Sequence, residues 1–163
     1  MPDQPPQPWA AFFDELDSQL TELVELHCVG GFVLTTVYRL PRVTGDCDYV
    51  AALGGSDQLD ALAGYDSPLH KKYQVYLQRV SVTTMPENYA SRLTEPFQGR
   101  FKNIRILVPD AYDLILSKLE RNSPKDREDV QYLSKTITLD VTVPPSEVQR
   151  RTTPAPLVTA RVA

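Results

Sequence analysis

The alternation of apolar and polar residues predicts helices and strands interleaved along this chain. Between Ala10 and Leu26, apolar residues recur at spacings of three and four, which is typical of an amphipathic helix. Short apolar or alternating runs at Leu26–Val29, Asp46–Leu53, Gln74–Thr83 and Asn103–Val108 predict strands. We therefore expect an α/β (α+β) domain with a small mixed sheet of roughly three to five strands flanked by helices.

Capping residues mark the starts of several further helices. Ser67-Pro68 places a cap and a proline at the first helical position, and Asp110 precedes a run that stays helical through Arg121. Ser123-Pro124-Lys125-Asp126 is a capping box that starts a last helix. The predicted helices after the first cover the ranges 32–38, 56–63, from 68 onwards, 86–93, 110–121 and from 123 to about 135.

Proline-rich ends flank the periodic part of the chain. Residues 1–8 carry four prolines in Met1-Pro2-Asp3-Gln4-Pro5-Pro6-Gln7-Pro8 and predict a flexible tail. From about Pro144 scattered proline and threonine show no apolar period, and we expect residues 139–163 to be flexible as well. The pattern leaves residues 9–138 as one folded domain.

Composition narrows the class of protein. A chain of 163 residues with 42% hydrophobic and 23% charged residues is typical of one globular domain. The net charge of −4 argues against whole-molecule attraction to nucleic acid, although Lys71-Lys72 and the stretch from Arg100 to Arg105 are locally basic. No run approaches the roughly 18 apolar residues of a membrane span, and the N-terminus resembles no signal peptide. We expect a cytoplasmic protein.

The two cysteines and two histidines do not form a metal-binding pattern. Cys28 and Cys47 lie in strand-like apolar contexts and are expected to be reduced, partly buried thiols. Without ligand spacing among these four residues, structural zinc is disfavoured.

Two short motifs carry the candidate chemistry. Gly30-Gly31 follows an apolar strand, and a glycine turn before a helix can cradle phosphate with backbone N–H groups. Asp46 and Asp48 alternate on a strand and therefore point to the same face. Two adjacent carboxylates repel each other unless a cation lies between them, and Mg²⁺ is the usual oxygen-bound ion. Together the motifs suggest phosphoryl transfer.

The order of these motifs resembles a known fold. Val29-Gly30-Gly31 followed by Leu40-Pro41-Arg42-Val43-Thr44-Gly45-Asp46-Cys47-Asp48 is similar to the nucleotidyltransferase fold of the DNA polymerase beta superfamily. The runs 109–121 and 124–130 resemble minimal bacterial nucleotidyltransferases related to the abortive-infection toxin AbiEii and neighbouring uncharacterised families. In those proteins a helix carrying a lysine precedes an Arg/Lys-Asp-x-x-Asp element. The resemblance covers residues 26–133.

This resemblance implies a nucleoside triphosphate as substrate. Gly30 and Gly31 would let the backbone approach the triphosphate. Asp46 and Asp48 would hold Mg²⁺, which bridges phosphate oxygens and activates the incoming hydroxyl.

Further site residues are implied by the second half of the resemblance. Lys118 would neutralise charge on the triphosphate, and Asp126 or Asp129, three apart on one helix face, would add a carboxylate. Arg42 and Arg121 are further candidates for phosphate contacts. The third sheet acid of many relatives has no counterpart in the predicted strands 74–83 and 103–108, which offer Arg79 and Arg105 instead.

Three functions fit these features. The first is a Mg²⁺-dependent nucleotidyltransferase that transfers a nucleoside monophosphate to RNA (tRNA) or to protein, as a toxin. The second is a non-catalytic binding module of the same fold that partners another protein, for example as half of a toxin–antitoxin pair. The third is a structural α/β domain whose acids are solvated surface.

Overall fold

A four-stranded mixed sheet organises the larger part of the chain. The computed structural model describes residues 2–81 and 85–136, so the predicted tail at 139–163 lies outside the described residues. Within this range the chain divides into a first unit, residues 2–81 and 92–110, and a second unit, residues 85–91 and 111–136. Residues 2–8 contain no helix or strand.

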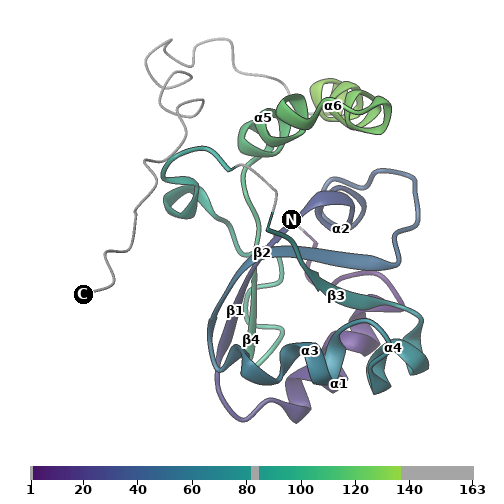
Figure 1. The fold of residues 1–163 in the computed structure, drawn as a ribbon, viewed down its shortest axis with the longest axis vertical. Coiled ribbons are helices and arrows are strands. Elements are labelled where there is room, and N and C mark those ends of the chain that lie inside the picture. The colour runs from purple at the N-terminus through teal and green to yellow at the C-terminus, as the bar shows by residue number, and fades with distance from the viewer. Residues whose placement is uncertain (1, 82–84, 137–163) are drawn as a thin grey trace. The chain divides into compact units, whose positions relative to one another are not determined.

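The sheet has the strand order β3-β2-β1-β4 (Figure 1). Its strands are β1 (Val24–Val29), β2 (Asp46–Gly54), β3 (Tyr76–Arg79) and β4 (Ile104–Leu107). Strand β1 runs antiparallel to β2 and parallel to β4, and β3 runs parallel to β2. The predicted small mixed sheet flanked by helices is therefore confirmed.

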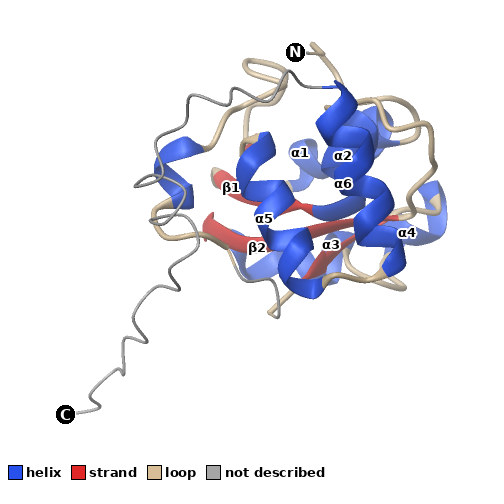
Figure 2. Ribbon diagram, turned by 90° about the horizontal axis from the view of Figure 1, so that it is seen from above, coloured by secondary structure: helices blue, strands red, loops and turns tan. Residues whose placement is uncertain are grey.

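Helices cover both faces of this sheet. Figure 1 shows α1 (Trp9–Gln19), α3 (Leu59–Ala63) and α4 (Pro68–Tyr73) on one face, and α2 (Gly30–Thr36) on the other. Figure 2 gives the same elements from above, with the strands in red and the helices in blue. The helix predicted for residues 32–38 begins two residues earlier, at Gly30.

An aromatic cluster joins α1 to α2. Trp9, Phe12, Phe13 and Phe32 are each no more than 3% exposed. The Phe32 ring centroid lies 4.9 Å from that of Trp9 and 5.8 Å from that of Phe13, in edge-on geometries that aromatic pairs prefer. This packing fixes the helix that follows the glycine turn.

The first helix is shorter than its apolar period predicts. It ends at Gln19 rather than Leu26, and β1 already begins at Val24. The Asn103 side-chain amide donates to the backbone carbonyls of Asp17 and Leu20, at 3.3 and 2.8 Å. A side chain more than 80 residues away in the sequence thus takes over carbonyls at the helix end, which no local pattern could indicate.

Three other predicted elements also differ from their predicted ranges. Strand β3 covers Tyr76–Arg79 of the predicted range 74–83, whose residues 82 and 83 lie outside the described residues. The strand starts late because Gln74 adopts a left-handed conformation that ends α4. The range 56–63 divides into a 3₁₀ turn, η1 (Ser56–Gln58), and α3. In the range 86–93 the structure has the 3₁₀ turn η2 (Tyr89–Arg92) in place of an α-helix.

The second unit contains a helical hairpin with the predicted boundaries. Helix α5 covers Ala111–Arg121 and α6 covers Pro124–Thr136. The capping box is formed, since the Asp126 N–H donates to Ser123 Oγ at 3.1 Å and the Ser123 N–H donates to Asp126 Oδ2 at 3.0 Å. In the described ranges, the helices are all too short or too polar to traverse a lipid bilayer.

Candidate functional site

The two aspartates lie on one face of β2, as the alternation predicts. Asp46 and Asp48 are half-buried, whereas the intervening Cys47 and the following Tyr49 are buried on the opposite face. The Thr44 hydroxyl donates to Asp46 Oδ1 at 3.0 Å. The loop that precedes β2 therefore holds the first carboxylate in place, while the strand presents both to the face that carries α2.

The glycine turn comes directly against the second carboxylate. Strand pairing sets Val29 opposite Asp48, so the chain reaches Gly30 at the position of this acid. Gly30 has a φ of +72°, and a Cβ atom built on it would lie 3.0 Å from Asp48 Oδ2. Only glycine adopts this backbone conformation readily and leaves room for the carboxylate. The structure thus brings together two motifs that are 18 positions apart in the chain (48 − 30).

The second glycine contacts the loop rather than an acid. A Cβ atom at Gly31 would lie 3.4 Å from Thr44 Oγ1, the same hydroxyl that donates to Asp46. Arg42, two residues before Thr44, is half-buried in this loop, and its backbone N–H donates to the Leu40 carbonyl at 2.7 Å. Gly31, Thr44 and Asp46 therefore form one side of the site, with Arg42 in the same loop.

Strand β3 supplies neighbours that sequence reasoning missed. In the parallel pairing, Tyr76 lies opposite Asp46 and Gln78 lies opposite Asp48. Burial, and then the charges of Asp46 and Asp48, raise the pKa of the Tyr76 phenol. The alternation over 74–83 predicts a strand, but the identity of its partner strand and the pairing register are not encoded locally.

The residues at this site fit a magnesium ion that is shared with a phosphate substrate. Mg²⁺ is commonly held by one or two carboxylates together with phosphate oxygens and water. Asp46 and Asp48 provide two carboxylates on one face, and the lack of a Cβ atom at Gly30 leaves the backbone open beside Asp48. Among the described residues, no third acidic, cysteine or histidine side chain joins such a pair to hold a metal. The other ligands of a magnesium ion would therefore be phosphate oxygens and water.

Neither arginine of the predicted strands takes the place of a third carboxylate beside Asp46 and Asp48. Arg105 in β4 pairs with Glu95 at 2.9 Å and with Glu25 at 3.2 Å. Strand β4 is separated from β2 by β1. Arg79 ends β3 and is exposed. The residue beside Asp48 on β3 is the neutral Gln78.

A pair of buried thiols lies on the opposite face of the same strands. The Sγ atoms of Cys28 and Cys47 are 3.6 Å apart, and both cysteines are free and fully buried. Burial, and then the hydrogen bond to Cys28, raise the pKa of the Cys47 thiol well above its usual range. The expectation of partly buried thiols is therefore corrected, since both side chains are fully buried.

In the second unit, the predicted lysine and aspartates form a buried ion network. Lys118 is 5% exposed, and its Nζ lies 2.7 Å from Asp129 Oδ2 and 3.6 Å from Asp126 Oδ1. Arg121 forms a two-pronged pair with Asp126, at 2.8 and 2.6 Å. Arg121, followed by Ser123, holds the pKa of Asp126 well below its usual range. These contacts hold α5 against α6, and a role for the four residues in nucleotide binding stays a prediction.

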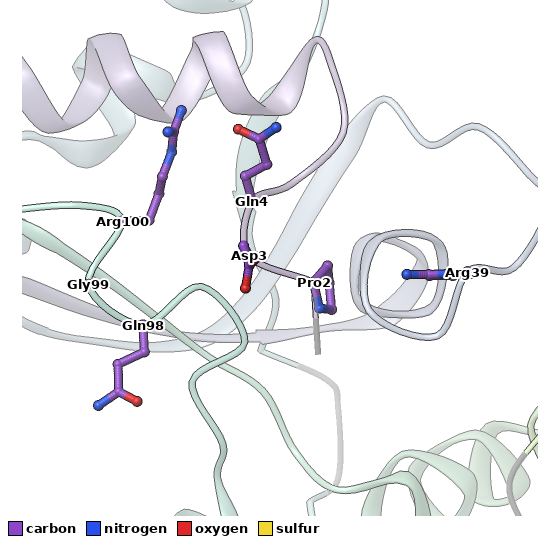
Figure 3. Close-up of a pocket in the computed structure, with 7 residues that line it drawn as sticks. All are labelled: Pro2, Asp3, Gln4, Arg39, Gln98, Gly99 and Arg100. Carbon is purple, nitrogen blue, oxygen red and sulfur yellow. The ribbon is translucent and has the colours of Figure 1, made fainter.

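A pocket elsewhere in the first unit gathers no convergent chemistry. It has a volume of about 710 Å³. In Figure 3, Gln98 points away from Gln4 and Arg100. Arg100 is engaged by Asp14 at 2.8 Å. The residues that line this pocket are Pro2, Asp3, Gln4, Arg39, Gln98, Gly99 and Arg100.

Comparison with known proteins identifies a family. Residues 11–143 match the family described as a nucleotidyltransferase of unknown function, DUF6036. No curated protein and no solved structure matches the chain. The matched range contains both glycines, both β2 aspartates and the α5–α6 hairpin.

Proposed function

The chain belongs to this family of nucleotidyltransferases of unknown function, and from that premise we propose a Mg²⁺-dependent transfer of a nucleoside monophosphate. The donor is a nucleoside triphosphate, and the acceptor is a hydroxyl group of RNA, such as tRNA, or of protein. The observation that carries the proposal is the close approach of Gly30 to Asp48. A Cβ atom built at Gly30 would lie 3.0 Å from Asp48 Oδ2.

Each candidate site residue of the first unit has a role in the proposed reaction. Asp46 and Asp48 would hold Mg²⁺, which when bound neutralises phosphate oxygens and increases the acidity of the acceptor hydroxyl. The backbone at Gly30 and Gly31 lets the phosphates approach closely, and Thr44 keeps Asp46 oriented. Arg42 is the candidate phosphate contact from the same loop.

The transfer itself exchanges one phosphorus–oxygen bond for another. The acceptor oxygen bonds to the α-phosphorus, the bond from this phosphorus to the β-phosphate oxygen breaks, and pyrophosphate leaves. The hydroxyl proton passes to water. Attacking and leaving oxygens lie roughly in line, so the acceptor approaches from the side opposite the pyrophosphate.

The role of the second unit is proposed from the resemblance alone. Lys118, Asp126 and Asp129 correspond to the lysine and the acidic element of minimal nucleotidyltransferases related to AbiEii, and Arg121 is a further candidate for a phosphate contact. Their contacts support a structural contribution to the hairpin. A catalytic contribution requires that Lys118→Met lower the rate of transfer while the hairpin stays folded.

Labelled nucleotide incorporation tests the proposal. The protein is incubated with each of the four labelled nucleoside triphosphates, Mg²⁺ and total tRNA, and the products are separated on denaturing gels. We expect incorporation that disappears with chelation of Mg²⁺ and falls at least a hundredfold in Asp46→Asn and Asp48→Asn. Asp57→Asn, which removes an exposed acid from η1, is the matched control. Activity retained in Asp46→Asn would exclude the proposed metal site.

A second function is favoured by the neutral Gln78 beside Asp48 and by the two-carboxylate set. Here the chain is a non-catalytic module of the same fold, acting in the cytoplasm as one half of a toxin–antitoxin pair. This function predicts no incorporation and a stable complex with the product of a neighbouring gene. Co-elution of the co-expressed pair on gel filtration supports it, and separate elution counts against it.

A further inference from the structure

Three aromatic rings cluster around Tyr76, the β3 residue paired with Asp46, without belonging to the main core. Tyr65 precedes α4, His70 lies within α4, and Tyr76 begins β3. Their ring centroids are separated by 5.0 Å (Tyr65–His70), 5.2 Å (Tyr65–Tyr76) and 4.7 Å (His70–Tyr76). Tyr65 is 75% exposed, which is unusual for a large ring already in contact with two others. We call these three residues the ring cluster.

The geometry of the ring cluster is fixed by hydrogen bonds. The Asp66 N–H donates to His70 Nδ1 at 2.8 Å, which leaves Nε2 as the protonated nitrogen of the neutral ring. The Ser67 hydroxyl caps the same helix by accepting from the His70 N–H at 3.2 Å. The exposed Tyr65 ring therefore contacts a His70 ring of fixed orientation, whose Nε2–H is a further donor.

The ring cluster lies on the side of the carboxylates opposite the glycine turn. Tyr76 is paired with Asp46 across β3 and β2, and neighbouring strands are about 4.8 Å apart. Gly30 follows β1, on the other side of β2. If the phosphates are held at Gly30 and Gly31, the β3 side stays open for the acceptor, whose oxygen attacks in line with the departing pyrophosphate.

We propose that the ring cluster binds the unpaired terminal nucleobase of an RNA acceptor. This inference rests on the proposed function and specifies its acceptor. Nucleobases stack on aromatic side chains whatever their sequence, and His70 Nε2–H offers a donor for a base edge. Exposed Lys71 follows His70 in α4, where its Nζ lies 3.8 Å from Asp66 Oδ1, and it supplies a positive charge for the RNA backbone. A hydroxyl side chain of a protein acceptor has no flat ring system that would use three such faces.

Binding of RNA can be measured without catalysis. Fluorescence anisotropy with the full chain, in the absence of Mg²⁺ and nucleotide, compares two RNA hairpins that have a single-stranded 3′ end. One ends in an intact nucleotide and the other in an abasic nucleotide. We expect the abasic RNA to bind roughly tenfold more weakly to the unaltered protein, the size of effect typical of one stacked base.

Variants then assign this loss to the ring cluster. Tyr65→Ala should weaken binding of the intact RNA by a similar factor and leave binding of the abasic RNA unchanged, whereas Tyr65→Phe keeps the stacking face and the affinity. Leu53→Ala is the matched control, because Leu53 is 52% exposed at the far end of β2. Circular dichroism verifies that each variant is folded.

The outcomes separate this inference from the proposed function. Equal affinity for the intact and abasic RNA, or an equal loss for both in Tyr65→Ala, overturns the ring cluster as a base site. If Tyr65→Ala raises the KM for the triphosphate and leaves the KM for RNA unchanged, the ring cluster binds the base of the nucleotide substrate, and this result also overturns the inference. If nucleotide incorporation fails while base-dependent binding persists, the proposed catalysis fails and the RNA-binding surface stands.

Discussion

Replacing Gly30 with alanine tests the close approach on which the site depends. The substitution adds one Cβ atom at a φ of +72°, 3.0 Å from Asp48 Oδ2. The left-handed conformation costs alanine about 1–2 kcal/mol of folding free energy. The contact adds a displacement of the carboxylate, and a misplacement of about 1 Å at a reacting centre can cost roughly a hundredfold in rate.

Gly99→Ala provides a matched control for this experiment. Gly99 also has a positive φ, +77°, but nothing lies within 4 Å of a Cβ atom built there. Both variants should lose about 1–2 kcal/mol in urea denaturation. Only Gly30→Ala should lose nucleotide incorporation, by roughly a hundredfold, with a weaker response to added Mg²⁺. Equal activity of the two variants, measured well below their unfolding temperatures, would refute the assigned contact.

Three further predictions concern stability and reactivity. Asp126→Asn should destabilise the protein by about 2 kcal/mol at pH 7, measured by urea denaturation, because Arg121 loses its charged partner. Since the folded state depresses the pKa of Asp126, its contribution is complete at neutral pH and declines progressively as the pH falls below about 4 towards this depressed pKa, so the difference between the two proteins should shrink over that range; a pH-independent difference would contradict the pairing. Phe32→Ala, at a fully buried ring, should cost about 3–5 kcal/mol in the same assay, and a loss under about 1 kcal/mol would contradict the packing. Cys28 and Cys47, both fully buried, should react with a thiol reagent only upon unfolding in urea, and fast labelling of the native protein would show that their strands open.

Much of the fold is predictable because its signals are local. The Ser123–Asp126 capping box and the Asp46–Asp48 alternation each depend on residues within three positions of one another, and the structure has both features as expected. The end of α1 is not predictable in this way, because Asn103 binds its terminal carbonyls from the other half of the chain.

The candidate site is predictable only in part. The pairing of β1 with β2 brings Gly30 to Asp48, which the order of motifs indicated through the resemblance. The neighbours Tyr76 and Gln78 come from the register between β2 and β3, which is set by packing across the whole sheet. Nor could the helical spacing of Lys118 indicate its burial, because an amphipathic pattern gives no account of charges that pair with each other in the interior.

The contact between the glycine turn and Asp48 also has an evolutionary consequence. Because any Cβ atom at position 30 would lie 3.0 Å from the carboxylate, the acid at position 48 adds to the requirement for glycine that the φ of +72° already imposes. A lineage that loses the acid at position 48 removes this contact, and a substitution at Gly30 then costs only what the backbone conformation imposes, so such substitutions are expected with the loss of the acid rather than before it. Family members with a side chain at position 30 are therefore expected to lack the acid at position 48, and this paired change would mark the inactive branches of the family.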